Sequence, residues 1–285
     1  MHTDDPRPDN QRKARADFEA LIREHGEELP LDMALLLLAS EDRGEVAVDD
    51  AIRKLDSLAQ SLADVFPHDA DDLSKLAALS DFLFVKENYR GNQEDYYDSR
   101  NSWLDDVLDR RKGIPITLSV LAMEVGRRLG FLLRGVGFPG HFLVTTQKPS
   151  GYFLDAFRGG QILRREDCRE LLTQLSGGNV EMKALDLEPV SSKQLVARVL
   201  QNIKGNHLRQ GDLSAAVAAV DRILLLFPSA YGLLRERGLM YLQLGAFTFA
   251  VHDLSTYLEL AADPPDADAI RGALGRAERK AQMLV

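Results

Sequence analysis

Residues 131–156 read FLLRGVGFPGHFLVTTQKPSGYFLDA and contain three short runs of apolar or alternating side chains. Glycine and proline bound the runs, which cover Phe131–Phe138, His141–Thr146 and Tyr152–Ala156. Short runs with such boundaries are typical of antiparallel strands. Residues 148–151, KPSG, supply a turn between the last two runs. We therefore expect a small antiparallel sheet near the middle of the chain.

Helical periodicity surrounds this sheet. Apolar residues recur at intervals of three and four from residue 14 to about residue 88. Three further helices are expected at Ser102–Arg111, Thr117–Leu129 and Arg164–Leu175. The predicted fold class is therefore α+β and mostly helical.

The last hundred residues contain an internal repeat. A shift of 34 residues aligns His207 with Tyr241, Gly211 with Gly245, Ala216 with Ala250 and Val220 with Leu254. A helix–turn–helix period of 34 residues is the tetratricopeptide pattern. Two repeats are fewer than the roughly three that stability usually requires. We expect this unit to be supported by flanking helices or by the middle of the chain.

Length and composition limit the class of protein. The chain has 285 residues, 45% of them hydrophobic, and a net charge of -9. This length fits about two domains. The longest apolar run, residues 33–39, is far shorter than the roughly 20 residues that span a bilayer, so no membrane association is expected. A single cysteine, Cys168, cannot form an internal disulfide, which favours a cytoplasmic location.

The charge is unevenly distributed along the chain. It is -13 over residues 1–99, +4 over residues 100–185 and zero over the remainder. The acidic balance gives no reason to expect a nucleic-acid partner. The predicted organisation is a disordered tail at 1–13, a helical region at 14–98 packed on the core, the core at 99–185 and the repeat region at 190–285.

One pair of residues has the chemistry of a catalytic site. His141 opens one predicted strand and Asp155 ends the next, so a hairpin would bring them together. A carboxylate beside an imidazole orients it, as in a nucleophile–His–Asp triad. The alternative is structural, with both residues capping turns or strand ends.

Cofactor and metal motifs are absent from the sequence. Residues 135–140, GVGFPG, fit the spacing G-x-G-x-x-G, but a strand-like run follows where a dinucleotide site needs a helix. Histidine, cysteine and acidic residues do not cluster at the spacing of metal ligands. We expect neither a cofactor nor a metal.

Several segments carry a family resemblance. They are RRKGIPITLS at 110–119, GVGFPGHF at 135–142, LDAF at 154–157, ENYRGN at 87–92 and Asn101. Together they resemble the bacterial Sir-B-type family, over about residues 30–265. In that family a transglutaminase-like core precedes tetratricopeptide repeats.

The resemblance implies a Cys–His–Asp triad, in which His141 matches the histidine and Asp155 the aspartate. The triad cysteine would begin the helix predicted at Thr117–Leu129, but residues 115–119 contain no cysteine. Thr117 and Ser119 are the available hydroxyls there. A hydroxyl lacks the acidity of a thiol at a helix N-terminus and would need full deprotonation by the histidine.

These observations favour a noncatalytic protein-binding or regulatory protein built on a degenerate core. The repeats would bind a protein or peptide partner. The candidate binding residues are Asn101, Arg110, Arg111, Lys112 and Tyr241. The alternative is an acyl-transfer or peptide-hydrolase enzyme that uses Thr117 or Ser119 with His141 and Asp155. A third possibility places Cys168 in the site as the nucleophile.

Overall fold

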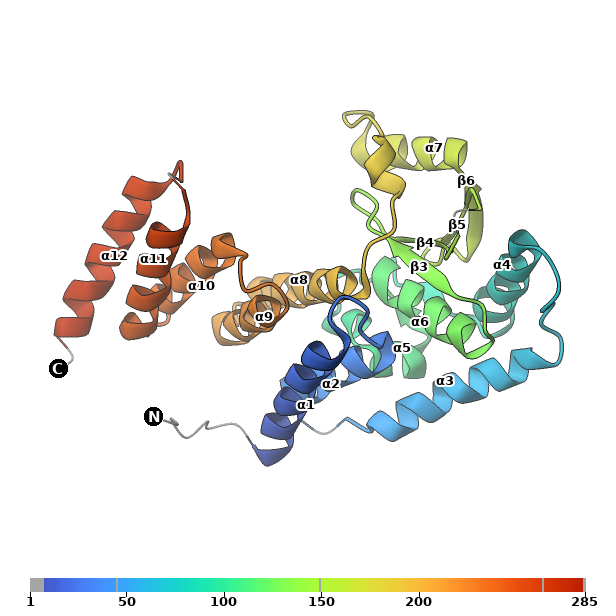
Figure 1. Ribbon diagram of the computed structural model, residues 1–285, viewed down its shortest axis with the longest axis horizontal. Helices are drawn as coiled ribbons and strands as arrows, with labels where there is room; N and C mark the ends of the chain where they lie inside the picture. Colours follow the sequence, from blue (N-terminus) through green and yellow to red (C-terminus); the bar gives the residue numbers. More distant parts are fainter. Residues whose placement is uncertain (1–7, 45, 149, 263, 284–285) are drawn as a thin grey trace. The chain divides into compact units, whose positions relative to one another are not determined.

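Figure 1 shows the computed structural model, which describes residues 8–44, 46–148, 150–262 and 264–283. The chain divides into two compact units, residues 1–199 and residues 200–285. The second unit begins ten residues after the predicted start of the repeat region at residue 190. The described part of the chain contains no helix long and apolar enough to cross a bilayer.

The first unit begins with four helices. They are α1 (Asp9–His25), α2 (Leu31–Arg43), α3 (Val48–Ala63) and α4 (Asp72–Ser80), and a short π-helix follows at Asp81–Lys86. The prediction of a disordered tail at residues 1–13 is wrong from Asp9 onward, because helix α1 already begins there. Buried Ala14 and Phe18 hold it on the fold, and burial of such side chains outweighs a polar, proline-containing start. Residues 1–7 of that tail lie outside the described residues.

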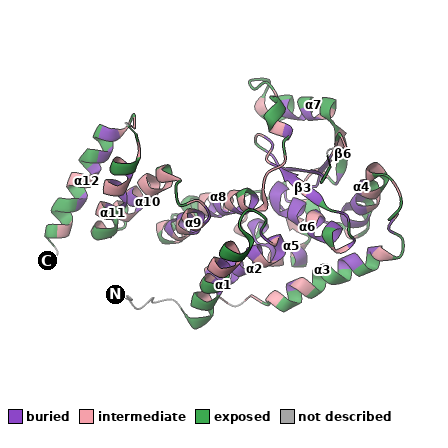
Figure 2. Ribbon diagram, in the orientation of Figure 1, coloured by how far each residue is buried: buried purple, intermediate pink, exposed green. Residues whose placement is uncertain are grey.

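The centre of the first unit is helix α6 (Pro115–Arg128), and eleven of its fourteen residues are buried. Figure 2 shows this helix in the buried colour beside strand β3. A 3₁₀ turn at Ser99–Ser102 and helix α5 (Leu104–Arg110) precede it. The two-residue strands β1 (Arg90–Gly91) and β2 (Lys112–Gly113) pair in parallel just before α6.

The predicted antiparallel sheet is confirmed. Its strands are β3 (Leu133–Val136), β4 (Leu143–Thr146), β5 (Tyr152–Asp155) and β6 (Gln161–Arg164), paired in chain order. Strand β6 was not expected from the sequence. Its pattern of exposure lacks the apolar alternation of a strand, and its pairing to β5 defines it. Helix α7 (Arg165–Ser176) follows directly.

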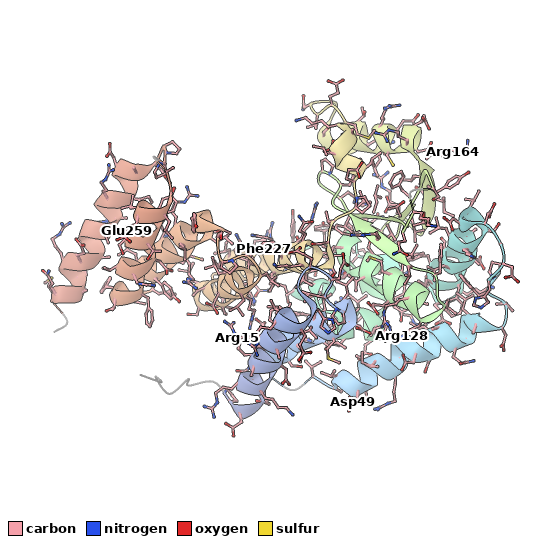
Figure 3. All side chains as sticks on the ribbon, in the orientation of Figure 1. Arg15, Asp49, Arg128, Arg164, Phe227 and Glu259 are labelled. Carbon is pink, nitrogen blue, oxygen red and sulfur yellow. The ribbon has the colours of Figure 1, made fainter. Side chains whose placement is uncertain are left out.

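Charged side chains join three helices of this unit. Arg128, labelled in Figure 3, extends from α6. Its guanidinium contacts Asp32 of α2 at 2.7 Å, Asp56 of α3 at 2.7 Å and Glu124 of α6 at 2.8 Å. The Arg128 side chain is 11% exposed, so its ion pairs with buried Asp32 and Glu124 are largely desolvated, whereas Asp56 is 60% exposed. They fix α6 against the helices that precede the core.

The second unit contains helical hairpins. Helix α8 (Ser192–Gln210) crosses the division between the units, and α9 (Leu213–Leu226), α10 (Tyr231–Gln243), α11 (Phe247–Leu260) and α12 (Ala267–Gln282) follow. Ala216 and Ala250, which the 34-residue shift aligns, are both fully buried. A Cβ added to Gly238 would lie 2.8 Å from Leu254, so α10 and α11 need a glycine at their contact. The repeat prediction is confirmed, and α12 packs on α11 after the second hairpin.

Candidate functional site

His141 and Asp155 meet at one end of the β4–β5 hairpin. The Nε2 atom of His141 lies 2.9 Å from Oδ1 of Asp155, and both side chains are buried. The same Oδ1 accepts hydrogen bonds from the backbone N–H groups of Phe157 and Arg158, each at 3.1 Å. The turn after β5 therefore fixes the carboxylate, and the carboxylate fixes the imidazole.

The His141 backbone and ring are also held. Arg198 donates from Nη2 to the carbonyl oxygens of Phe138 and His141, both at 2.9 Å. The imidazole packs edge-on against Phe157, with ring centroids 6.0 Å apart. Within the described residues, Nδ1 has no hydrogen-bond partner. An imidazole with one nitrogen on a carboxylate and the other unbonded can accept or donate a proton there.

The hydroxyls expected to act as nucleophiles are bonded elsewhere. Thr117 Oγ1 donates to the carbonyl of Asn101 at 2.7 Å and accepts from the N–H of Ile114 at 3.2 Å. Ser119 Oγ donates to the carbonyl of Pro115 at 2.8 Å. Both hydroxyl side chains are fully buried. The structure brings His141 and Asp155 together, but gives neither hydroxyl a hydrogen bond to His141 in the described part of the chain.

Cys168 lies on α7 inside a hydrophobic cluster with Val136, Phe138 and Leu143. It is fully buried, and burial raises the pKa of its thiol to about 12. A thiol with this pKa contains almost no thiolate near neutral pH. Within the described residues its sulfur makes no hydrogen bond to His141.

The three consecutive basic residues have different partners. Arg110 pairs with Asp98 at 2.8 Å. Arg111 pairs with Glu87 at 3.0 Å from a left-handed backbone conformation. Lys112 pairs with Glu94 at 3.2 Å. Each of these three candidate binding residues is therefore paired with a different carboxylate.

The other two candidates have structural neighbours. The side-chain amide of Asn101 is buried, accepts a hydrogen bond from Asn92 at 3.0 Å and donates to the carbonyl of Asp95 at 2.8 Å. It organises the segment before α5. Tyr241 stacks on Phe249, with centroids 5.3 Å apart, and burial raises the pKa of its hydroxyl.

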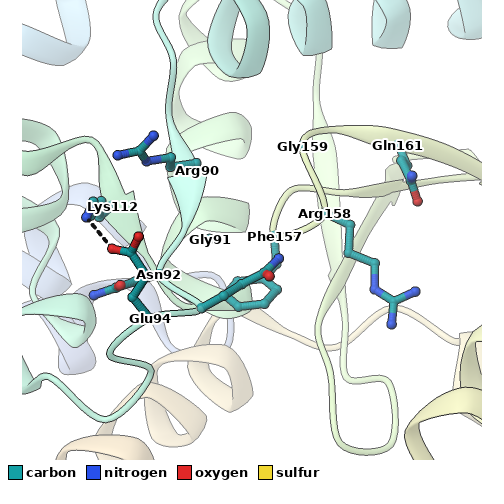
Figure 4. Close-up of a pocket in the computed structure, with 10 residues that line it drawn as sticks. Arg90, Gly91, Asn92, Glu94, Lys112, Phe157, Arg158, Gly159 and Gln161 are labelled. Atoms are coloured by element: carbon teal, nitrogen blue, oxygen red, sulfur yellow. Dashed lines mark hydrogen bonds and ion pairs between the residues drawn. The ribbon is translucent and has the colours of Figure 1, made fainter.

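Two concave surfaces accompany these residues. A cleft of about 690 Å³ lies beside the His–Asp pair, and Arg90, Lys112, Phe157, Arg158 and Gln161 contribute to its lining (Figure 4). Of these lining residues, only Lys112 is among the candidate binding residues predicted from the sequence, although Arg90 and Phe157 lie in the segments ENYRGN and LDAF. The cleft combines β1, β2 and the turn after β5, and no local motif joins these segments.

A second concavity belongs to the repeats. It has a volume of about 520 Å³ and an apolar lining that includes Leu208, Leu213, Leu239 and Met240. Charged residues such as Arg235 also line it. No group of three or more histidine, cysteine, aspartate or glutamate side chains in the described ranges is arranged to hold a metal ion.

Comparison with known proteins places these observations in context. Residues 49–201 match the transglutaminase-like superfamily, and residues 203–275 match the tetratricopeptide repeat. A UPF0162 protein from Xylella fastidiosa is 38% identical over 265 residues, which cover 90% of this chain and 93% of the relative. A UPF0162 protein from Pseudomonas aeruginosa is 31% identical over 245 residues, 85% of this chain and 88% of the relative. Human F-box only protein 21 is 31% identical over 182 residues, which are 60% of this chain and 28% of that protein.

Proposed function

The chain belongs to the transglutaminase-like superfamily and to the bacterial UPF0162 proteins, and from this premise we propose that it is a noncatalytic, protein-binding regulator. In this proposal the core keeps the His141–Asp155 pair as a structural element. The C-terminal repeats bind a peptide segment of a protein partner. We place the protein in the cytoplasm, as its single cysteine suggests.

The first turn of α6 lacks an available nucleophile, and this observation supports a noncatalytic core. The helix begins at Pro115, and its early positions hold no cysteine. Its hydroxyls, Thr117 and Ser119, donate to backbone carbonyls and are fully buried. Nucleophilic catalysis needs a nucleophile within hydrogen-bond reach of its base. This arrangement supports a core that holds a fold rather than one that transfers an acyl group.

The repeat groove supports the binding role. Its lining includes Leu208, a leucine that is exposed to solvent and not packed in a hydrophobic core. A groove lined by both apolar and charged side chains suits an amphipathic peptide, which can place its apolar face on the leucines and keep its polar side in water. Tetratricopeptide stacks present such concave surfaces for extended partners.

A chemical test separates this proposal from the enzyme alternative. The full-length protein is treated with a fluorophosphonate probe, which phosphonylates activated hydroxyls with release of fluoride. We expect no labelling of Thr117 or Ser119. Labelling at either residue that disappears in the variant His141→Gln would overturn the proposal in favour of an acyl-transfer or hydrolase reaction.

A matched pair of substitutions tests the groove. Leu208 lines the groove and is 39% exposed, whereas Leu244 is 41% exposed and does not line it. Protein partners crosslinked to the full-length chain in cells are quantified for Leu208→Glu and Leu244→Glu. We expect Leu208→Glu to remove most of the captured partner while Leu244→Glu retains it. Equal capture by both variants would contradict binding at the groove.

A further inference from the structure

We propose that the first unit contains a separate binding site, a basic cleft between β1 and the β5–β6 turn, that accepts an acidic peptide segment. The cleft is separate from the repeat groove, because all its lining residues lie between Arg90 and Gln161. It is also separate from the buried His–Asp pair, whose two side chains do not line it. A ligand in this cleft would therefore occupy a different site from the partner proposed for the repeats.

The two walls of the cleft are fixed against each other. One wall is β1 with residues 92–94, and the other is the turn at residues 157–161 (Figure 4). Phe157, the first residue of this turn, lies next to the β1 wall. A Cβ added to Gly91 would lie 2.5 Å from both the ring and the carbonyl of Phe157, so the walls touch at this glycine. The N–H of Phe157 is bonded to buried Asp155. The cleft is thus preformed, which reduces the ordering that a ligand must impose.

The charge in the cleft is positive and incompletely balanced. Arg90, Lys112 and Arg158 line it, and Glu94 is the one carboxylate among the lining residues. The Lys112–Glu94 contact of 3.2 Å involves a Glu94 side chain that is 85% exposed, so water screens it strongly. A carboxylate of a bound peptide can replace Glu94 at Lys112 with little loss.

The two arginines keep donors available. The Arg90 guanidinium makes no hydrogen bond or ion pair within the described residues. Arg158 donates from Nη1 to the neutral side chain of Gln174 at 3.0 Å, and its Nε lies 3.9 Å from Asp155. Guanidinium groups form paired, charge-assisted hydrogen bonds to carboxylates. In a chain with a net charge of -9, three cations with donors still available in one concavity, against one lining carboxylate, favour an anionic ligand.

The size and layout favour a peptide over a single small anion. The volume of about 690 Å³ is much greater than one phosphate group needs. Figure 4 shows Arg90 and Lys112 on one side of Phe157, with Arg158 and Gln161 on the other. Cations on opposite walls fit carboxylates at separate positions of a chain. The exposed amides of Gln93 and Gln161 can bond to a peptide backbone between them.

Binding of a fluorescein-labelled hexaglutamate peptide to the full-length chain tests the proposal by fluorescence anisotropy. The cleft variant carries Arg90→Gln, Lys112→Gln and Arg158→Gln. The matched control carries Arg23→Gln, Arg165→Gln and Arg169→Gln, three exposed cations outside the cleft. We expect saturable binding at about 50 mM salt, weakened about tenfold in the cleft variant and less than about twofold in the control. Melting temperatures verify folding, and Arg90→Gln alone serves if the triple variant is unfolded.

Hydrogen exchange locates the peptide. We expect hexaglutamate, but not hexaglutamine, to slow exchange at residues 90–94 and 157–161. Equal weakening in the cleft and control variants would overturn the site, as would protection confined to other segments or the absence of saturable binding. Inorganic phosphate that displaces the probe at or below the peptide's own half-saturating concentration would overturn the peptide assignment in favour of a phosphate ligand.

Discussion

Asp155 is fully buried, and one of its oxygens accepts three hydrogen bonds. We expect Asp155→Asn to lower the free energy of unfolding by about 3 kcal/mol, because it removes a buried charge and mispairs at least one donor. Urea denaturation measures the change. Asp109→Asn makes the same chemical substitution at a side chain that is 57% exposed, and should leave the stability nearly unchanged. Similar losses in both variants would contradict a structural role for the His–Asp pair.

Cys168 provides a test of burial at a single atom. With a pKa of about 12, its thiol should react with iodoacetamide at pH 8 at least about a hundredfold more slowly in the native protein than in urea. The native rate should rise about tenfold per pH unit up to about pH 10, because the thiolate fraction rises in that way. Mass spectrometry of the alkylated peptide gives both rates. Rapid native labelling that requires His141 would support Cys168 as a nucleophile.

The contact between His141 and Asp155 was predictable because a hairpin has only local geometry: two strands and a turn of known position bring fixed ends together. The partners of Thr117 were not predictable. Its hydroxyl donates to the carbonyl of Asn101, and this contact depends on how the segment before α5 folds over α6. Arg158 was missed for a related reason, since its place in the cleft follows from the turn after β5.

Among the elements, α6 carries a network of buried charges with α2. The hydrogen bond from Arg128 lowers the pKa of Asp32, although burial alone would raise it. Burial, and then the charge of Asp32, raises the pKa of Glu124. The pKa values of the two carboxylates therefore shift in opposite directions. Of the two arginines that contact both carboxylates, Arg128 is the more buried.

We expect Arg128→Met to reduce the stability of the first unit by about 3–5 kcal/mol at pH 7, because it leaves two buried carboxylates short of a cation. Arg127→Met removes a cation that contacts the same two carboxylates but is 49% exposed, and should cost about 1 kcal/mol or less. Urea denaturation of both variants measures these losses.

The pH dependence of the Arg128→Met loss has a definite sign. Without Arg128, the folded-state pKa of Asp32 should rise above its unfolded value and the already raised pKa of Glu124 should rise further, so the folded variant binds more protons than the unfolded chain. The variant therefore loses stability as pH rises from 5 to 7. Its deficit relative to the parent should be larger at pH 7 than at pH 5. A deficit that is equal at both pH values would contradict this account of the network.

Helices and strands differed in how well the sequence predicted them. The apolar periodicity of α3 places its buried face without tertiary information. Strand β6 has no such pattern, because its side chains are half-buried or exposed and its hydrogen bonds to β5 define it. Helix α1 was missed in part because its first residues are polar, while Ala14 and Phe18 supply the anchor further along.

At the scale of the whole molecule, each unit has its own apolar clusters. One cluster of the first unit joins the sheet to α7 around Val136 and Phe153. In the second unit, one cluster joins α9 with α10 and another joins α10 with α11 and α12. The 34-residue repeat made the second unit recognisable from sequence. The exact division at residue 199 was not recognisable, because it lies inside the continuous helix α8 and neither a glycine nor a proline stands beside it.

A substitution at Arg237 tests the stability of the second unit separately, because both of its ion-pair partners lie in that unit. It joins α10 to Asp253 of α11 at 2.7 Å and to Asp221 of α9 at 2.8 Å, and Asp253 is almost fully buried. We expect calorimetry of the parent to resolve two unfolding transitions. Arg237→Met should lower one of them by more than about 10 °C, because breaking a buried ion pair in a unit of this size has a large thermal effect. Arg271→Met, which removes a cation paired with a 98% exposed Asp268, should move neither transition appreciably. Arg128→Met should lower the other transition, so a single transition that both buried-arginine variants shift together would show that the two units unfold as one.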